Sequence, residues 1–261
     1  MRSKWLVLAV AAAVVAVGAT GCNRAPKTAE DVLARSLKAH GGESLTAWTT
    51  LTVRGRVEMQ DGITYNAAFL LQAKAPGRVR VEQDMTADRG RVFNDLFLND
   101  GQAWSRRNLV VNPRGNLKQM QRWLRHSYGI AYYTQHGTGA SLGPDQTVEW
   151  KSQPDAAGKI ETVTRPAYVV NTKVDGESVK LFIDKETFYV LQEAWPDGRR
   201  VHRDFRKFGT VVFPTRVLDI TVSREGRETV LPYTYESVTF DTPIEDWVFA
   251  EDRPKGTGQG N

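Results

Sequence analysis

The strongest constraint on the fold is an alternation of apolar and polar residues that recurs through most of the chain. In residues 51–59 the odd positions are apolar or glycine and the even positions are polar, which is the pattern of a strand with one buried face. Strand-like runs also occur at 65–71, 79–82, 92–98, 167–173, 179–183, 188–195, 205–212, 215–223 and 233–240. Asp-Gly pairs, which favour tight hairpin turns, stand at 61–62, 100–101, 175–176 and 197–198. The pattern predicts an antiparallel meander.

Two segments with helical spacing accompany the strands. Thr28 can cap a helix that ends at Gly41-Gly42, and Asn116 can cap a second helix from 117 to about 128. The glycines in residues 129–145 then predict a mobile loop. Because the apolar face of the sheet must be covered, we expect a mainly β protein with helices. It would be a strongly curved antiparallel sheet (unclosed β-barrel) with an N-terminal helix and a helical lid, whose lid residues are Leu117, Met120 and Leu124.

The N-terminus has the layout of a bacterial export signal. A short positive segment precedes an apolar run from Trp5 to Val17, which is too short for an ordinary transmembrane helix. Ala19-Thr20-Gly21-Cys22 resembles the lipobox of bacterial lipoproteins, with Ala19 where the usual box has Leu. The resemblance implies diacylglycerol (and palmitate-type acylation) on Cys22 and cleavage after Gly21. An ordinary signal peptide with an incidental cysteine remains the alternative.

The residue after Cys22 indicates to which membrane a lipoprotein is sorted. In the best-known sorting rule Asp at this place retains a lipoprotein at the inner membrane, and here the residue is Asn23. We therefore expect a lipid-anchored protein at the periplasmic face of the outer membrane, with the inner membrane as the less favoured site. The expected organisation is a lipoprotein signal peptide (1–21), a lipidated tether (22–27), one folded domain (28–250) and a C-terminal tail (251–261).

Several stretches of the folded domain resemble the LolA-like family. Residues 181–191 resemble a strand pair of that family, and 204–209 leading into Val212-Phe213-Pro214 resembles another of its motifs. Trp247-Val248-Phe249 fits the family's terminal Phe. The family includes LolA and LolB, which have an unclosed β-barrel with helices as a lid. The resemblance implies a non-enzymatic carrier or acceptor of the acyl chains of lipids or lipoproteins, in which the membrane is met through lipidated Cys22.

The acyl chains would lie against the inward face of the sheet. The apolar residues expected there are Val53, Val57, Phe69, Leu71, Val81, Leu181, Ile183, Leu191 and Ile220. Alternation does not distinguish a filled core from a hollow one, so both interpretations stay open. A periplasmic sensor or interaction module of the RseB type is the alternative function, and the sequence names no protein partner for it.

Motifs for catalysis are weak. Residues 139–143 match the G-x-S-x-G pattern around Ser141, but the pattern needs a preceding strand and a following helix, and Pro144 follows it closely. We therefore predict no catalytic residue and no enzyme activity.

Metal, cofactor and nucleic-acid motifs are equally weak. The four histidines, at 40, 126, 136 and 202, have no paired ligand spacing. We expect His40 at a helix end, where a cation suits the dipole, and the others exposed or singly hydrogen-bonded. The net charge of +5 is dispersed along the chain, which argues against a nucleic-acid partner. No metal and no cofactor are predicted.

Overall fold

The computed structural model describes residues 25–60, 64–87, 90–108, 110–151 and 159–250. The predicted signal peptide, Cys22, the turn at 61–62 and the C-terminal tail therefore lie outside the described residues. No helix in the described ranges combines the length and the apolar character needed to cross a membrane.

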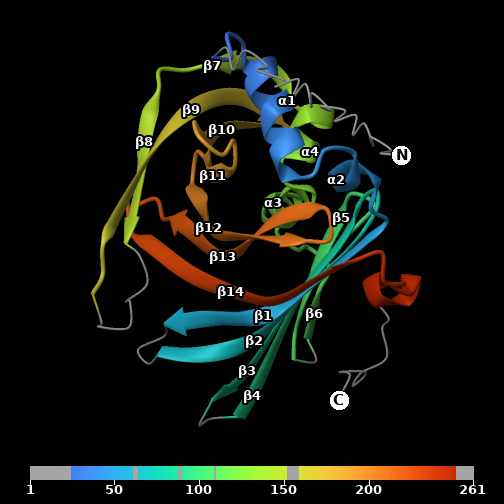
Figure 1. Cartoon of the computed structure of the whole chain (residues 1–261). Helices are drawn as coiled ribbons and strands as arrows, with labels where there is room; N and C mark the ends of the chain where they lie inside the picture. Colours follow the sequence, from blue (N-terminus) through green and yellow to red (C-terminus); the bar gives the residue numbers. More distant parts are fainter. Residues whose placement is uncertain (1–24, 61–63, 88–89, 109, 152–158, 251–261) are drawn as a thin grey trace, which may run out of the picture.

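The described strands form a single antiparallel sheet of 14 strands that curves strongly around the helices (Figure 1). The first arm of the sheet consists of β1 (Thr50–Gln60), β2 (Thr64–Lys74), β3 (Arg78–Ala87), β4 (Gly90–Asn99), β5 (Gln102–Arg107) and β6 (Val110–Asn112). The second arm consists of β7 (Thr138–Leu142), β8 (Gln146–Lys151), β9 (Thr162–Val174), β10 (Glu177–Asp184), β11 (Val190–Trp195), β12 (Gly198–Phe208), β13 (Val211–Val222) and β14 (Glu228–Phe240).

The two arms meet at a seam between β1 and β14. From this seam the strands follow chain order outward, to β6 on one side and to β9 on the other, where β7 and β8 both pair with β9. Within the described strands no pairing links β6 to β7 or β8, so the sheet is not closed into a barrel. The predicted meander is confirmed, and the three Asp-Gly pairs that the structure describes connect β4 to β5, β9 to β10 and β11 to β12.

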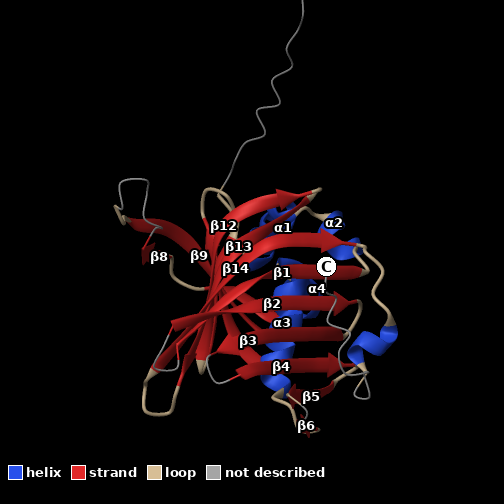
Figure 2. Ribbon diagram, turned by 90° about the horizontal axis from the view of Figure 1, so that it is seen from below, coloured by secondary structure: helices blue, strands red, loops and turns tan. Residues whose placement is uncertain are grey.

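Four α-helices and a short 3-10 helix accompany the sheet: α1 (Ala29–His40), α2 (Glu43–Ala47), α3 (Leu117–Tyr128), α4 (Ile130–His136) and η1 (Asp246–Phe249). The predicted caps are confirmed. The Thr28 hydroxyl accepts from the Asp31 amide at 3.1 Å, and the Asn116 side chain accepts from the Gln119 amide at 3.1 Å. Figure 1 shows α3 inside the curve of the sheet, and Figure 2 shows α3 and α4 behind β1 to β4.

The prediction of a mobile loop over residues 129–145 is wrong, because this segment forms α4 and β7. Two of its glycines allow close packing. A Cβ on Gly137 would lie 2.4 Å from the Tyr133 carbonyl oxygen, and a Cβ on Gly143 would lie 3.1 Å from Nδ2 of the Asn171 side chain. The predicted strand over 205–212 is two strands, since β12 ends at Phe208 and β13 begins at Val211.

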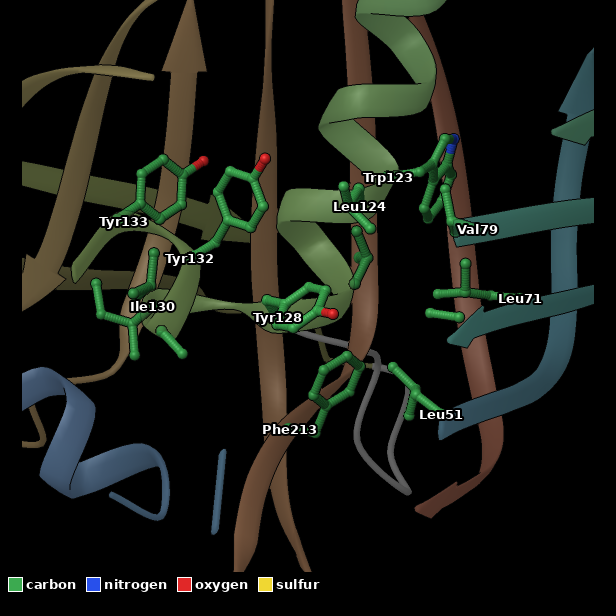
Figure 3. Close-up of a cluster of buried hydrophobic side chains, with 14 of the residues drawn as sticks. Leu51, Leu71, Val79, Trp123, Leu124, Tyr128, Ile130, Tyr132, Tyr133 and Phe213 are labelled. Atoms are coloured by element: carbon green, nitrogen blue, oxygen red, sulfur yellow. The ribbon is translucent and has the colours of Figure 1, made fainter. Parts of the chain in front are cut away.

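The main core lies between the concave face of the sheet and the helices (Figure 3). α3 packs against β3, β4 and β5, and its side chains Met120, Trp123 and Leu124 are 1%, 1% and 6% exposed. Leu117 of the same predicted face is 40% exposed at the start of the helix. The concave face is therefore covered by α3 in this structure.

Candidate functional site

The sheet splits between β13 and β14 on one side of the molecule. Residues 216–222 of β13 pair with β14. Within the described residues, 211–214 pair only with β12, and Tyr235 and residues 237–240 pair only with β1. The two strands therefore share one end and diverge toward the other. A lateral opening in a sheet gives access to the concave side without disturbing the outer strands.

Local sequence explains why the strands diverge here. Pro214 lies in the half of β13 that has no β14 partner, and proline suits such a place because it lacks an amide hydrogen. The register of β1 against β14 shifts between Arg54 and Gly55, which is a β-bulge. A Cβ on Gly55 would lie 2.0 Å from the Thr234 carbonyl oxygen, so only glycine fits this position. A bulge bends and twists its strand, which directs β14 away from β13.

A second glycine brings α2 to the split. Gly41 ends α1 with a φ of 125°, and a Cβ at this position would lie 2.8 Å from the carbonyl oxygen of Thr210. α1 therefore approaches the turn between β12 and β13 closely. The chain then reverses into α2 and sets Trp48 beside the split.

A groove of about 800 Å³ follows this split. Its apolar wall is formed by Trp48, Phe208, Val211, Val238 and Phe240, and its polar rim by Ser44, Lys207, Thr210, Thr239, Asp241 and Thr242. The lining is therefore about equally apolar and polar, and its apolar part offers contacts to a small apolar ligand. We call this feature the split groove.

Aromatic contacts connect the split groove to α3. The ring of Trp48 lies 4.4 Å from that of Tyr128, the last residue of α3, and 6.3 Å from that of Phe240. Phe213 lies 6.5 Å from Phe240 and continues the wall inward. Gly129 follows Tyr128 with a φ of 54°, a conformation that favours glycine, and turns the chain into α4. Displacement of the end of α3 would thus extend the split groove into the core.

The nine predicted cavity residues are all buried, but they do not all share one face. Seven lie in the main core beneath the helices: Val53, Val57, Phe69, Leu71, Val81, Leu181 and Ile183. Leu191 belongs instead to a separate cluster with Val148 and Phe182. Ile220 lies on the face of β13 opposite to Val217, which is a core residue, because side chains alternate along a strand. The sequence pattern therefore located most of the concave face and misplaced two positions.

Buried charges, which the sequence analysis missed, fasten α3 to the second arm. The Glu177 carboxylate accepts hydrogen bonds from Arg122 and, at 2.6 Å, from Arg125. Burial alone raises the pKa of Glu177, but these hydrogen bonds hold it below its ordinary value. Arg200 donates to Asp219 at 2.9 Å and to the carbonyl oxygen of Arg122 at 3.0 Å. We call these five residues the α3 latch. No periodic pattern indicates such pairs, since their members lie far apart in the chain.

α4 has its own polar attachment to the sheet. The Tyr133 hydroxyl donates to the Glu193 carboxylate at 3.0 Å in the interior. Burial raises the pKa of Glu193, although the Arg200 cation nearby acts in the opposite direction. Burial, followed by the Glu193 charge, raises the pKa of Tyr133 well above its ordinary value. The tyrosine hydroxyl is therefore protonated and available as a donor.

His40, His126 and His202 are buried. The expectation that histidines other than His40 are exposed or singly hydrogen-bonded agrees with the structure, whereas the expectation of a charged His40 is wrong. Nδ1 of His40 lies 3.0 Å from the Val212 carbonyl oxygen, and its Nε2 accepts from the Val190 amide at 3.1 Å. Nε2 of His126 lies 2.9 Å from the Tyr235 hydroxyl oxygen. Burial lowers the pKa of His40 to about 4 and that of His202 to about 3, so these side chains are neutral near pH 7. His40 is thus not a cation placed at a helix end.

The other candidate sites lie elsewhere. Ser141 is exposed in β7 and faces Asn171 of β9, and the next element is a strand, so the setting differs from the strand–turn–helix of a nucleophile elbow. Across the described ranges, no group of three or more His, Cys, Asp or Glu side chains is placed to hold a metal ion.

Two solved structures have an architecture similar to this one. A LolA superfamily protein from Nitrosomonas europaea superposes with a TM-score of 0.56 over 87% of this chain and 99% of its own, at 15% sequence identity. The chain has a LolA-like fold. A DUF1329 family protein from Desulfovibrio piger matches with a TM-score of 0.51 over 85% of this chain and 96% of its own, at 10% identity. No protein-family model and no curated protein matches the LolA-like chain by sequence.

Proposed function

We propose that this protein is a lipid-anchored periplasmic carrier or acceptor that binds acyl chains of lipids or lipoproteins without catalysis. The observation that carries the proposal is the split groove, about 800 Å³ in volume, whose aromatic wall ends at the lid helix. The LolA-like fold supports it. An acyl chain would enter beside Trp48, with its polar end at the rim near Lys207.

Transfer in such a carrier requires no chemical step. Each buried methylene contributes about 0.8 kcal/mol, so a groove that holds one chain competes with other apolar sites for it. Deeper entry would displace Tyr128 and then the buried face of α3, formed by Met120 and Leu124. The proposed lid is therefore α3 with the turn at Gly129. Leu117, which is exposed, contributes little to the closed state.

The anchor belongs to this proposal as well. Lipidation of Cys22 would hold the folded domain at the periplasmic face of the outer membrane, with residues 22–27 as a short tether. Multiple acyl chains on one residue give stable attachment, whereas a single chain holds a protein only marginally.

A sensor or interaction module of the RseB type is the second candidate. The observation that favours it is the filled concave face, where α3 is buried and fastened by the α3 latch. In that function the protein would recognise a partner at its surface and take no acyl chain into the core.

Quenching of tryptophan fluorescence by chain-brominated fatty acids separates the two functions, since bromine quenches only indoles that it contacts. We expect saturable quenching in the purified, delipidated protein, and loss of most of it in Trp48→Phe. Trp247→Phe is the matched control, because Trp247 is 43% exposed in η1, away from the split groove. Quenching that does not saturate, or that survives Trp48→Phe unchanged, would overturn the carrier and favour the interaction module.

A further inference from the structure

A second groove, of about 470 Å³, lies on the second arm of the sheet. It is lined by parts of β9, β10 and β11, with Gly139 of β7 at its edge. Val170 and Leu181 of these strands point into the main core. Because side chains alternate along strands, Asn171, Lys173, Ser178 and Lys180 point to the opposite face. We call this feature the lysine groove.

The lysine groove carries uncompensated positive charge. Lys173 lies opposite Ser178, and Lys180 lies opposite Asn171, so the two lysines are diagonal neighbours on adjacent strands. Both are exposed, and neither forms an ion pair with another described residue. Two positive charges on adjacent strands repel each other. A bound anion would remove that cost.

The acidic residues at the ends of these strands pair with arginines of α3, and not with the two lysines. Glu177 and Asp197 bind Arg122, and Asp175 lies 3.7 Å from Arg125. These carboxylates are thus engaged by α3 on the concave side. The arginines that latch the lid leave the convex side of the same strands positive.

The lysine groove lies on the side of the molecule where the chain leaves the fold toward its proposed anchor. Figure 1 shows the first described residues and the start of α1 beside β7, and α1 packs against β7. The described chain begins at Ala25, three residues after Cys22. Three residues of extended chain span about 10 Å. If Cys22 is lipidated, a membrane surface lies within reach of this side.

We propose that the lysine groove binds the phosphate group of an anionic phospholipid in the membrane that carries the anchor. Lys173 and Lys180 would neutralise the phosphate, and the Asn171 amide and Ser178 hydroxyl would donate hydrogen bonds to it. The folded domain would then be held in one orientation, with β9 and β10 against the membrane. The inference rests on the proposed lipid anchor and is independent of whether the split groove takes an acyl chain.

The test uses the lipidated protein in nanodiscs. Acetylation of lysines, read by mass spectrometry, should be at least fivefold slower at Lys173 and Lys180 in phosphatidylglycerol nanodiscs than in phosphatidylcholine nanodiscs. Lys38 and Lys118, both exposed on helices, should react equally in the two lipids. Equal rates at Lys173 and Lys180 would overturn the proposal. Protection of the detergent-solubilised protein by glycerol 3-phosphate to the same extent would reassign the groove to a free phosphate ester.

Charge-matched variants separate the groove from general attraction to an anionic surface. In phosphatidylglycerol nanodiscs, hydrogen exchange of β10 should accelerate at least fivefold in Lys173→Gln/Lys180→Gln and remain unchanged in Lys38→Gln/Lys118→Gln. Equal effects of the two double variants would contradict a specific site. The mass of the N-terminal peptide reports whether Cys22 is lipidated, and quenching at Trp48 reports acyl binding. Failure of the lysine groove is therefore distinguishable from failure of the proposed function.

Discussion

At the scale of single residues, the molecule keeps three uncharged histidines inside a polar interior. His40, His126 and His202 line a small cavity of about 20 Å³ together with Glu193. The rings of His126 and His202 lie 5.3 Å apart, and among the described residues Nε2 of His202 has no hydrogen-bond partner. Burial, followed by the Arg200 charge, lowers the pKa of His126 well below its ordinary value. Protonation of any of the three would place a further positive charge in the core.

The histidines make stability depend on pH. Unfolded histidine titrates at about 6.5, whereas burial lowers the folded pKa of His202 to about 3. Between these values only the unfolded chain binds the proton, so the free energy of unfolding falls by about 1.4 kcal/mol per pH unit for each histidine. The contribution is fully present above about pH 6.5 and is lost on acidification.

We expect the free energy of unfolding, measured with urea, to depend less steeply on pH in His202→Gln than in the unmodified protein. The difference in slope should be about 1.4 kcal/mol per pH unit between about pH 6 and 4.5. Glu193, whose pKa is raised by burial, acts in the opposite direction in both proteins and cancels in the comparison. His136→Gln is the control, since His136 is exposed. Identical slopes for His202→Gln and the unmodified protein would contradict the assignment.

Gly55 is the residue on which the register between β1 and β14 depends. Gly55→Ala would place a methyl group 2.0 Å from the Thr234 carbonyl oxygen. We expect a loss of about 1–3 kcal/mol of stability, because backbone must shift to admit the methyl group. Gly77→Ala is the matched control, with no heavy atom closer than 3.7 Å to its Cβ. Equal melting temperatures of the two variants would show that the bulge tolerates a side chain.

At the scale of elements, α3 is held by charge as well as by apolar packing. Glu177→Gln should cost about 1–3 kcal/mol, because Arg122 and Arg125 lose a part-buried carboxylate that accepts their hydrogen bonds. Hydrogen exchange should accelerate along α3 more than in β1 to β3. The control is Glu228→Gln, which breaks an exposed ion pair with Arg199 and should leave the melting temperature nearly unchanged. Uniform acceleration over all elements would contradict a local latch.

The elements also show how far the sequence could predict this structure. Alternation and Asp-Gly turns located most strands of the sheet, and the capping residues Thr28 and Asn116 located two helices. The short strands β5 to β8, near the two ends of the sheet, were missed, because they are too brief or too exposed to show a period of two. α4 was missed because its flanking glycines resemble those of a loop.

The candidate site was harder to predict than the fold. The split groove depends on where β13 and β14 cease to pair, and this follows from tertiary contacts of Gly41 and Gly55. The concave-face residues were partly predicted, because alternation marks them. No sequence pattern indicated buried ion pairs such as Arg200–Asp219. A charged residue in an alternating strand is instead expected on the exposed face.

At the scale of the whole molecule, the proposed anchor on Cys22 would decide where the fold acts. We expect Cys22→Ser to abolish incorporation of labelled palmitate and to block cleavage after Gly21, because the thiol is the group that forms the thioether. The measurement is metabolic labelling followed by mass analysis of the N-terminal peptide. Ser141→Ala serves as a control that leaves labelling intact. Normal labelling of Cys22→Ser would reject the lipoprotein assignment.

The seam between β1 and β14 has a consequence for biogenesis. Leu51 pairs with Phe240, so the two arms can join only when nearly the whole chain has been delivered. Contacts between such distant residues form slowly. Until then β1 presents an unpaired edge, which is prone to association with other chains. A chain of this kind would need its exposed strand shielded during secretion, and truncations that remove β14 should aggregate although every other strand is present.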